Sequence, residues 1–173
     1  MNKIDEVPLA WRGNDSLASL LRVTRREVRI LLANSESMLN CVFKAFFGAL
    51  LPPGTPVRFN CTGNVAGFRR QLRSGEFDLC ILILNNLLAK ESPGKDRIEQ
   101  TIDALAEAKR SCPTPIVVYS GYCPDAAFAR RVRRAGADHF GLLPFTVPQL
   151  RAAICRAWSR RKSGRKPFGR TRR

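Results

Sequence analysis

The sequence predicts an α/β protein in which helices cover both faces of a parallel sheet. Two observations indicate this class. Five short apolar segments alternate along the chain with five amphipathic segments, and the run from Leu79 to Leu84 is apolar at every position, as in a strand buried on both faces. Such alternation implies right-handed crossovers and a three-layer α/β/α sandwich. A length of 173 residues fits one domain of this kind with short extensions.

The first strand and helix are predicted between residues 28 and 51. Residues 28–33 read Val-Arg-Ile-Leu-Leu-Ala, which is typical of a buried strand, and the small polar residues that follow suit a helix N-terminus. A helix over residues 36–51 is indicated by apolar residues three and four positions apart, and two prolines and a glycine end it. Its apolar positions are Leu39, Val42, Phe43, Phe46, Phe47 and Leu50.

The second strand is predicted over residues 57–61. Asn64 is the expected N-cap of the next helix, and Gly75 is its expected end because glycine readily adopts the left-handed conformation found there. The buried face of this helix carries Val65, Phe68 and Leu72. The apolar third strand then begins after Asp78.

The second half of the chain repeats the pattern. Its helices show apolar residues at three- or four-residue spacing, and prolines and glycines separate the elements, as expected for alternating helices and strands. In order, they are a helix over 96–110, a strand over 115–119, a helix over 124–135, a strand over 139–142 and a helix from Val147 that carries Leu150, Ile154 and Trp158.

Basic residues exceed acidic ones by 30 to 14, a net charge of +16. Residues 159–173 hold eight bases and no acid, half of this excess. We predict a domain over 27–160, a disordered basic tail over 161–173 and an N-terminal extension over 1–26 that contains a weakly amphipathic stretch, residues 16–23. The tail suits nucleic acid, an acidic lipid surface or an acidic protein, or merely aids solubility. Its basic residues are Arg160, Arg161, Lys162, Arg165, Lys166, Arg170, Arg172 and Arg173.

The sequence also predicts the compartment and argues against a metal centre. It contains neither a run of apolar residues long enough for a membrane span nor a signal-peptide pattern, so we expect a cytoplasmic protein. The six cysteines are then expected to be free thiols. No Cys-x-x-Cys pair occurs, and His139, the single histidine, has no cysteine close to it in the sequence. A zinc site is therefore not expected.

Three segments in the second half of the chain carry a family resemblance. They read Val-Val-Tyr-Ser-Gly over residues 117–121, Ala-Gly-Ala-Asp over 135–138 and Leu-Leu-Pro-Phe over 142–145. In their order and spacing the chain resembles, over about residues 27–160, the receiver domain of bacterial two-component response regulators. The resemblance implies a flavodoxin-like doubly wound sheet with strand order 2-1-3-4-5 and a role in phosphorelay signal transduction.

The resemblance also implies where the phosphorylation site of the family would lie. An acidic pair after the first strand holds magnesium in the family, and here Asn34 and Ser35 occupy those places. The phosphoacceptor aspartate at the end of the third strand corresponds to Ile83. The hydroxyl residue at the end of the fourth strand is retained as Ser120, and the lysine before the proline is replaced by Leu143.

These replacements remove the side chains that the reaction uses. An isoleucine supplies no nucleophilic oxygen, and a register shift that places Leu84 there changes nothing. Magnesium prefers carboxylate oxygens, and the absent lysine removes a cation that would pair with a bound phosphoryl group. We therefore expect a degenerate pseudo-receiver that lacks the phosphoacceptor aspartate, needs no metal or other cofactor and is not an enzyme.

Arginines gather on the two helices that flank the last strand. In the family these helices and the strand form the partner or dimer surface, so we expect a protein partner there, or a second copy of the chain. Phe140 stands where the family has an aromatic residue that turns inward on activation, and we expect it to pack. A solvated face is the alternative, since Arg69, Arg70 and Arg73 form another cationic cluster. The predicted partner surface comprises Arg130, Arg131, Arg133, Arg134, Phe140 and Arg151, with Arg156 nearby.

Three classes of function are then compared. The expected one is a phosphorylation-independent, receiver-like signalling or adaptor protein that acts through protein–protein interaction. The alternative is a nucleic-acid-binding protein that uses the basic tail and the arginine-rich helices. An enzyme with its site at the carboxyl ends of the strands ranks last, because the sequence has no glycine-rich phosphate-binding loop. Asp78 and Asp138 are expected to have structural roles.

Overall fold

A computed structural model describes residues 27–51, 54–87, 96–123 and 125–163. Within these ranges the chain forms a five-stranded sheet whose neighbouring strands are all parallel, in the order β2-β1-β3-β4-β5. The predicted class and strand order are thus confirmed. The strands are β1 (Val28–Ala33), β2 (Val57–Thr62), β3 (Leu79–Ile83), β4 (Ile116–Ser120) and β5 (His139–Leu142).

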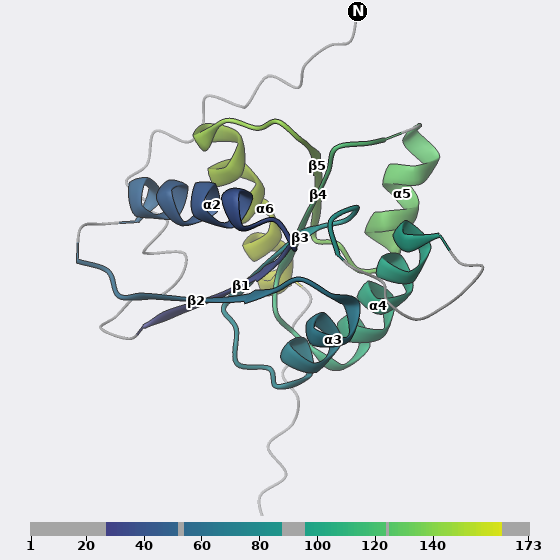
Figure 1. Cartoon of the computed structure of the whole chain (residues 1–173), viewed down its shortest axis with the longest axis horizontal. Coiled ribbons are helices and arrows are strands. Elements are labelled where there is room, and N and C mark those ends of the chain that lie inside the picture. The colour runs from purple at the N-terminus through teal and green to yellow at the C-terminus, as the bar shows by residue number, and fades with distance from the viewer. Residues whose placement is uncertain (1–26, 52–53, 88–95, 124, 164–173) are drawn as a thin grey trace, which may run out of the picture.

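Helices cover both faces of the sheet, as the alternating pattern predicts (Figure 1). Two helices pack on one face and three on the other. The first pair is α2 (Ser37–Leu50) and α6 (Val147–Ser163), and the other three are α3 (Val65–Arg73), α4 (Arg97–Ser111) and α5 (Ala126–Arg134).

Each face of the sheet has its own hydrophobic core because side chains alternate along a strand. On the α3/α4/α5 side, Leu82 of β3 and Val118 of β4 are buried. On the α2/α6 side, the next residues of the same strands, Ile83 and Tyr119, are buried. Both strands are covered on their two faces at every position, which explains their unbroken apolar sequences.

Side chains at the amino ends of helices and strands fix the local geometry. Asn64 is the N-cap of α3, as predicted, and its side chain accepts a hydrogen bond of 2.7 Å from the backbone N–H of Gly67. Asp78 accepts a 3.0 Å bond from the N–H of Arg29, and Asp138 accepts a 2.8 Å bond from the N–H of Ile116. These two carboxylates therefore join neighbouring strands at the amino edge of the sheet, which supports the structural roles expected for them.

Two boundaries differ from the sequence prediction. Helix α6 continues to Ser163, so the start of the tail at residue 161 was predicted too early, and Arg160, Arg161 and Lys162 belong to the last turn of this helix. Intrahelical hydrogen bonding extends past the last apolar residue, where a pattern based on burial gives no signal. The other predicted tail bases, Arg165, Lys166, Arg170, Arg172 and Arg173, and the whole extension 1–26 lie outside the described residues.

The apolar face of α2 was also predicted too broadly. Phe43 and Phe47 are fully buried, but Val42 is 38% exposed, because position 42 lies at the side of the helix rather than over the sheet. As for membranes, none of the helices in the described ranges combines the length with the apolar character that a bilayer-spanning segment needs.

Candidate functional site

The carboxyl ends of β1, β3 and β4 form the candidate site. In an open parallel sheet, ligands bind outside the carboxyl ends of the strands, where successive helices leave toward opposite faces. Helix α2, which follows β1, packs on one face of the sheet. Helix α4, which follows β3, packs on the other face. The crevice position therefore lies between β1 and β3, which are neighbours in the sheet.

The structure brings the predicted site residues to this edge. Asn34 and Ser35 follow β1, and the hydroxyl of Ser35 donates a hydrogen bond to the carbonyl oxygen of Asn86, in the turn after β3. The N–H of Ser35 donates to the same oxygen at 3.2 Å. On the other side of β3, the N–H of Leu143 donates to the carbonyl of Ser120 at 2.9 Å. The loops after β1 and β3 are thus joined, as are the loop after β5 and the end of β4.

Ile83, in the predicted phosphoacceptor position, belongs to the hydrophobic core. Its side chain is 0% exposed, and it lies in the cluster formed by β-strands, α2 and α6. Leu143, in the predicted lysine position, is half-buried and packs against the same cluster. Neither residue presents a polar atom to the carboxyl edge.

A closed set of amide hydrogen bonds occupies the edge between β1 and β3. The buried Asn34 donates from Nδ2 to Oδ1 of Asn40 at 3.2 Å and to the carbonyl of Glu36 at 2.8 Å. Asn86 in turn donates from Nδ2 to Oδ1 of Asn34 at 3.2 Å and to Oε1 of Glu36 at 2.8 Å. Each amide therefore already has partners, as buried polar groups require.

Ser120 has both of its hydrogen-bonding functions satisfied within its own turn. Its hydroxyl donates to the carbonyl of Tyr122 at 2.7 Å and accepts from the N–H of Tyr122 at 3.1 Å, and the residue is fully buried. His139 lies beside Val117 in the sheet, three residues before Ser120 along β4, which corresponds to roughly 10 Å. The imidazole of His139 is therefore too far away to act as a general base for this hydroxyl.

The donor set at this edge does not fit a magnesium ion. Magnesium takes hard oxygen ligands in octahedral geometry and depends on carboxylate charge. Glu36 contributes one carboxylate, and its Oε1 already accepts a bond from Asn86. Within the described ranges, no three His, Cys, Asp or Glu side chains gather in a way that could hold a metal ion.

Sequence reasoning missed three residues of this network, namely Glu36, Asn40 and Asn86. Asn40 did carry a signal, because it is a polar residue on the inward face of an otherwise apolar helix. Such a residue is expected to have a buried partner. The partner itself, 52 residues away in the case of Asn86 and Asn34, could not be read from local sequence.

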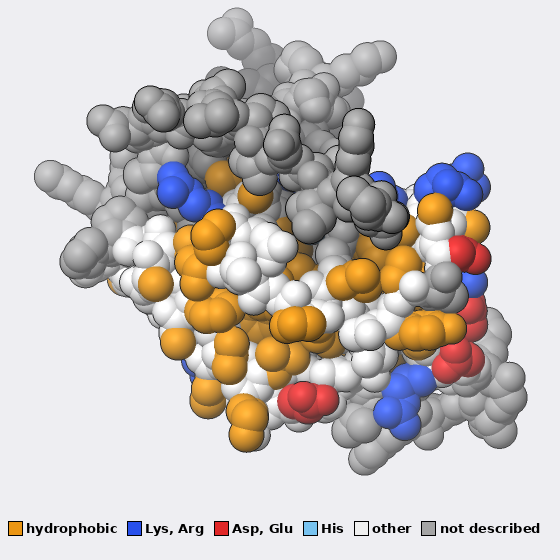
Figure 2. Space-filling view, turned by 90° about the horizontal axis from the view of Figure 1, so that it is seen from above, with side chains coloured by type: hydrophobic (Ala, Val, Ile, Leu, Met, Phe, Trp, Pro, Cys, Tyr) orange, Lys and Arg blue, Asp and Glu red, His pale blue; other side chains and the backbone are white. Residues whose placement is uncertain are grey.

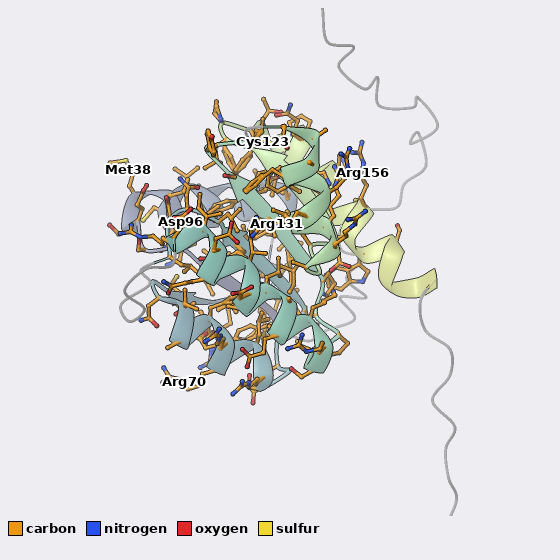
Figure 3. All side chains as sticks on the ribbon, turned by 90° about the vertical axis from the view of Figure 1, so that its right-hand side faces the viewer. Met38, Arg70, Asp96, Cys123, Arg131 and Arg156 are labelled. Carbon is orange, nitrogen blue, oxygen red and sulfur yellow. The ribbon has the colours of Figure 1, made fainter. Side chains whose placement is uncertain are left out.

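The second predicted functional region is the arginine-rich surface of α5 and α6, which we call the α5/α6 surface. It consists of exposed arginines that form no ion pair with any residue the structure describes, and they are Arg130, Arg133, Arg134, Arg151 and Arg156. Arg131 differs, because it pairs with Glu99 of α4. Figure 3 shows Arg131 facing α4 and Arg156 on the opposite side of α5.

Phe140 does not belong to this surface, contrary to the prediction that included it. Its side chain is 7% exposed, and its ring packs edge-on against Phe128 of α5 at a centroid distance of 6.1 Å. The reason is the alternation of β5, which turns position 140 toward the core on the α5 side.

The second cationic cluster, on α3, is partly neutralised by one carboxylate. Arg69 pairs with Glu107 of α4 at 3.1 Å, and Arg73 pairs with the same carboxylate. Arg70 alone of the three is exposed without a described acidic partner. The α5/α6 surface therefore differs from the α3 cluster in the number of arginines without a described acidic partner, five against one.

Comparisons with known proteins support the fold. No protein-family model and no curated protein matches the chain. Solved structures do: the signal receiver domain of a modulated diguanylate cyclase from Desulfovibrio desulfuricans G20 is 14% identical with a TM-score of 0.62, over 81% of this chain and 100% of that one. A CheY-like response regulator receiver domain protein from Methanospirillum hungatei JF-1 is 14% identical with a TM-score of 0.58, over 80% and 98%.

A third similar structure is a response regulator protein from Burkholderia pseudomallei, described with a phosphorylated aspartic acid and a calcium ion. It is 18% identical with a TM-score of 0.57, over 79% of this chain and 71% of that one. At these identities the likeness establishes the fold of a receiver domain, and the functional residues must be judged from this chain itself.

Proposed function

We propose that the protein is a receiver-like signalling module that works without phosphoryl transfer and without enzymatic activity. It acts by binding a protein partner through the α5/α6 surface. The observation that carries the proposal is the identity of the residue that ends β3, where a fully buried isoleucine, Ile83, stands in place of a carboxylate.

The chemistry of the carboxyl edge supports the first half of the proposal. Phosphoryl transfer to a protein needs a nucleophilic oxygen near a cation that neutralises the incoming charge. The amides of Asn34 and Asn86 are poor nucleophiles and are bonded to each other, and the Ser120 hydroxyl is bonded within its turn. The edge is therefore expected to hold one conformation without a metal or a phosphoryl group.

The charge distribution supports the second half. An arginine that lacks an intramolecular acid retains its capacity for charge-assisted bidentate hydrogen bonds to a carboxylate. Five such residues on the two helices that flank β5 favour a partner with an acidic surface. The adjoining Leu142, 51% exposed at the end of β5, adds an apolar contact of the kind found in protein interfaces.

The first half is tested by challenging the purified protein with magnesium and acetyl phosphate. We expect no phosphate adduct in the intact mass, while a receiver domain that retains its aspartate and is treated in parallel acquires one. A stoichiometric, hydroxylamine-sensitive adduct on this chain would contradict the proposal, and peptide mapping would identify the acceptor.

The second half is tested by cross-linking in nuclease-treated extracts followed by mass spectrometry. We expect cross-links from one partner to map to α5 and α6, and to be lost in an Arg134→Glu/Arg151→Glu variant. The control is Arg70→Glu on α3, which reverses an exposed charge away from this surface. Loss of the cross-links in both variants would indicate a non-specific charge effect.

A second candidate function is nucleic-acid binding by the same arginines. The observation that favours it is the continuation of α6 to Ser163, which places the bases of residues 160–162 on the helix that carries Arg151 and Arg156. Here the expected result is duplex binding whose log affinity falls linearly with log salt, with a slope of about −0.9 for each phosphate neutralised. Absence of duplex binding at low salt would exclude this candidate and leave the first.

A further inference from the structure

The outer face of α2 is apolar along its length. Met38 is 80% exposed and Val42 is 38% exposed, and the side chains of Cys41, Ala45 and Ala49 are exposed as well. We call these five residues the α2 face. Lys44 is the one charged residue of the helix. A helix that is hydrophobic on every side is normally buried on every side.

The other helices of the domain do not share this feature. The outer surfaces of α4 and α5 carry Glu99, Asp103, Arg130 and Arg134, as surface helices usually do. Seen from above, hydrophobic side chains gather on the left half of the described surface, the side on which Figure 1 places α2, and charged side chains are sparse among them (Figure 2). An exposed apolar patch of this kind marks an interaction site.

We propose that the α2 face is covered by the chain's own N-terminal segment, residues 16–23, packed on it as an amphipathic helix. This segment lies outside the described residues. Leu17, Leu20 and Leu21 recur at three- and four-residue spacing, and Asp15 and Ser16 precede them as possible N-caps. The segment thus has one apolar stripe and needs a surface to bury it.

The point of attachment places this segment beside α2. The N–H of Val28, the first residue of β1, donates to the carbonyl of Pro56 at 2.9 Å, so the chain enters the sheet next to the loop that follows α2. Because α2 returns antiparallel to β1 after the first crossover, its C-terminal half, with Ala45 and Ala49, lies at this end of the sheet.

The lengths also agree. Residues 24–26 span up to roughly 10 Å when extended, which is enough to pass from β1 to the helix layer. Eight helical residues measure roughly 12 Å, and the stretch of α2 from Cys41 to Ala49 also measures roughly 12 Å. A helix over residues 16–23 is therefore long enough to cover the part of the α2 face between Cys41 and Ala49.

A tethered segment has an advantage over a second copy of the chain as the occupant. A short linker gives an effective concentration in the millimolar range, far above the concentration of free copies in a dilute solution. Small side chains at positions 41, 45 and 49 also let a helix approach closely. The proposal is independent of the function proposed for the α5/α6 surface.

The reactivity of Cys41 tests the proposal in the full-length protein. A pulse of N-ethylmaleimide followed by peptide mass spectrometry measures the labelling rate of each cysteine. Cys41 and Cys61 are both exposed in the described domain, while Cys80 is fully buried. If the segment covers the α2 face, Cys41 reacts about tenfold more slowly than Cys61 or slower still, because labelling then requires the segment to open.

Variants in the segment provide the matched comparison. Leu20→Asp/Leu21→Asp places two charges in the apolar stripe and is expected to raise the Cys41 rate to that of Cys61. The control, Ala18→Asp/Ser19→Asp, places the same charge on the opposite side of the segment and is expected to leave the rate unchanged. Cys80 must stay unlabelled in each variant, which shows that the domain remains folded.

A change in α2 itself gives a second route to the same result. Ala45→Glu puts a charge in the centre of the α2 face at an exposed position and is expected to raise the Cys41 rate as Leu20→Asp/Leu21→Asp does. The proposal is overturned if Cys41 reacts as fast as Cys61 in the unmodified protein, or if the segment variants leave its rate unchanged. Protection that disappears on dilution would also overturn it, because the occupant would then be a second copy.

Discussion

Replacing Ile83 by aspartate tests whether this position is part of the core or part of a vestigial acidic pocket. The side chain is 0% exposed and packs in the core between the sheet and the α2/α6 layer. Truncating a buried isoleucine costs about 2–5 kcal/mol, and a buried carboxyl group without a partner adds about 1–3 kcal/mol even when it is protonated. We therefore expect Ile83→Asp to lower the free energy of unfolding by about 3–8 kcal/mol while the carboxyl is protonated.

The pH dependence makes this prediction sharper. Burial raises the pKa of a carboxyl group above its ordinary value of about 3.9. A group whose pKa is raised in the folded state loses its contribution to stability as the pH rises above the ordinary value. The loss in free energy of unfolding caused by Ile83→Asp should thus grow as the pH rises from about 4, near the ordinary pKa, to about 7. Ile83→Asn, which has similar size but no titratable group, should show a constant deficit.

Urea unfolding followed by circular dichroism measures these deficits. Ile83→Val provides a conservative control, with an expected loss of about 0.5–1.5 kcal/mol. The reasoning would be refuted if Ile83→Asp lost less than about 1 kcal/mol, well below the cavity cost. It would also be refuted if the deficit shrank as the pH rose, since that would reveal a cation or an open pocket beside position 83.

Three further predictions concern the stability of the fold. Tyr119→Phe should raise the free energy of unfolding by about 1 kcal/mol, because the buried hydroxyl has no hydrogen-bond partner among the described residues. The phenylalanine ring keeps the stacking on Phe145, at a centroid distance of 4.5 Å. A loss of stability in urea titrations would reveal a partner for the hydroxyl. Gly136→Ala should cost about 1–3 kcal/mol, since φ is +118° and the new Cβ would lie 2.6 Å from the Cβ of Lys109; an unchanged melting temperature would show that the turn adapts. Burial raises the pKa of both Cys80 and Tyr119, so these groups stay protonated in the folded state. The free energy of unfolding should therefore decline as the pH rises above about 9. An unchanged free energy of unfolding up to about pH 11, roughly one unit above the ordinary tyrosine pKa, would contradict this.

The fold was readable from sequence because its signals are local. The strands β3 and β4 are unbroken apolar runs, and the N-cap Asn64 lies at the start of an amphipathic helix. Where burial gives no signal, the prediction failed. The residues at the end of α6 are polar, so its continuation to Ser163 was not predicted. The three- and four-residue spacing of apolar positions could not distinguish the partly exposed Val42 at the side of α2 from the buried Phe43.

The candidate site was readable in position but not in its contacts. Local motifs placed Asn34, Ile83 and Ser120 at one edge of the sheet. The bonds that close this edge connect residues far apart in sequence, such as Asn34 and Asn86, and depend on the exact register of β1 and β3. The inclusion of Phe140 in the partner surface was wrong for a related reason, since the direction of a side chain in a short edge strand is fixed by its pairing.

The central claim is that the carboxyl edge of the sheet does not take up a divalent cation with a phosphoryl group. The most direct test is a pair of ¹H–¹⁵N correlation spectra of the full chain, recorded with and without magnesium and beryllofluoride, an analogue of the phosphoryl group. The account predicts unchanged amide signals for residues 34–36, 83–86 and 120. Saturable shifts confined to these residues would contradict it.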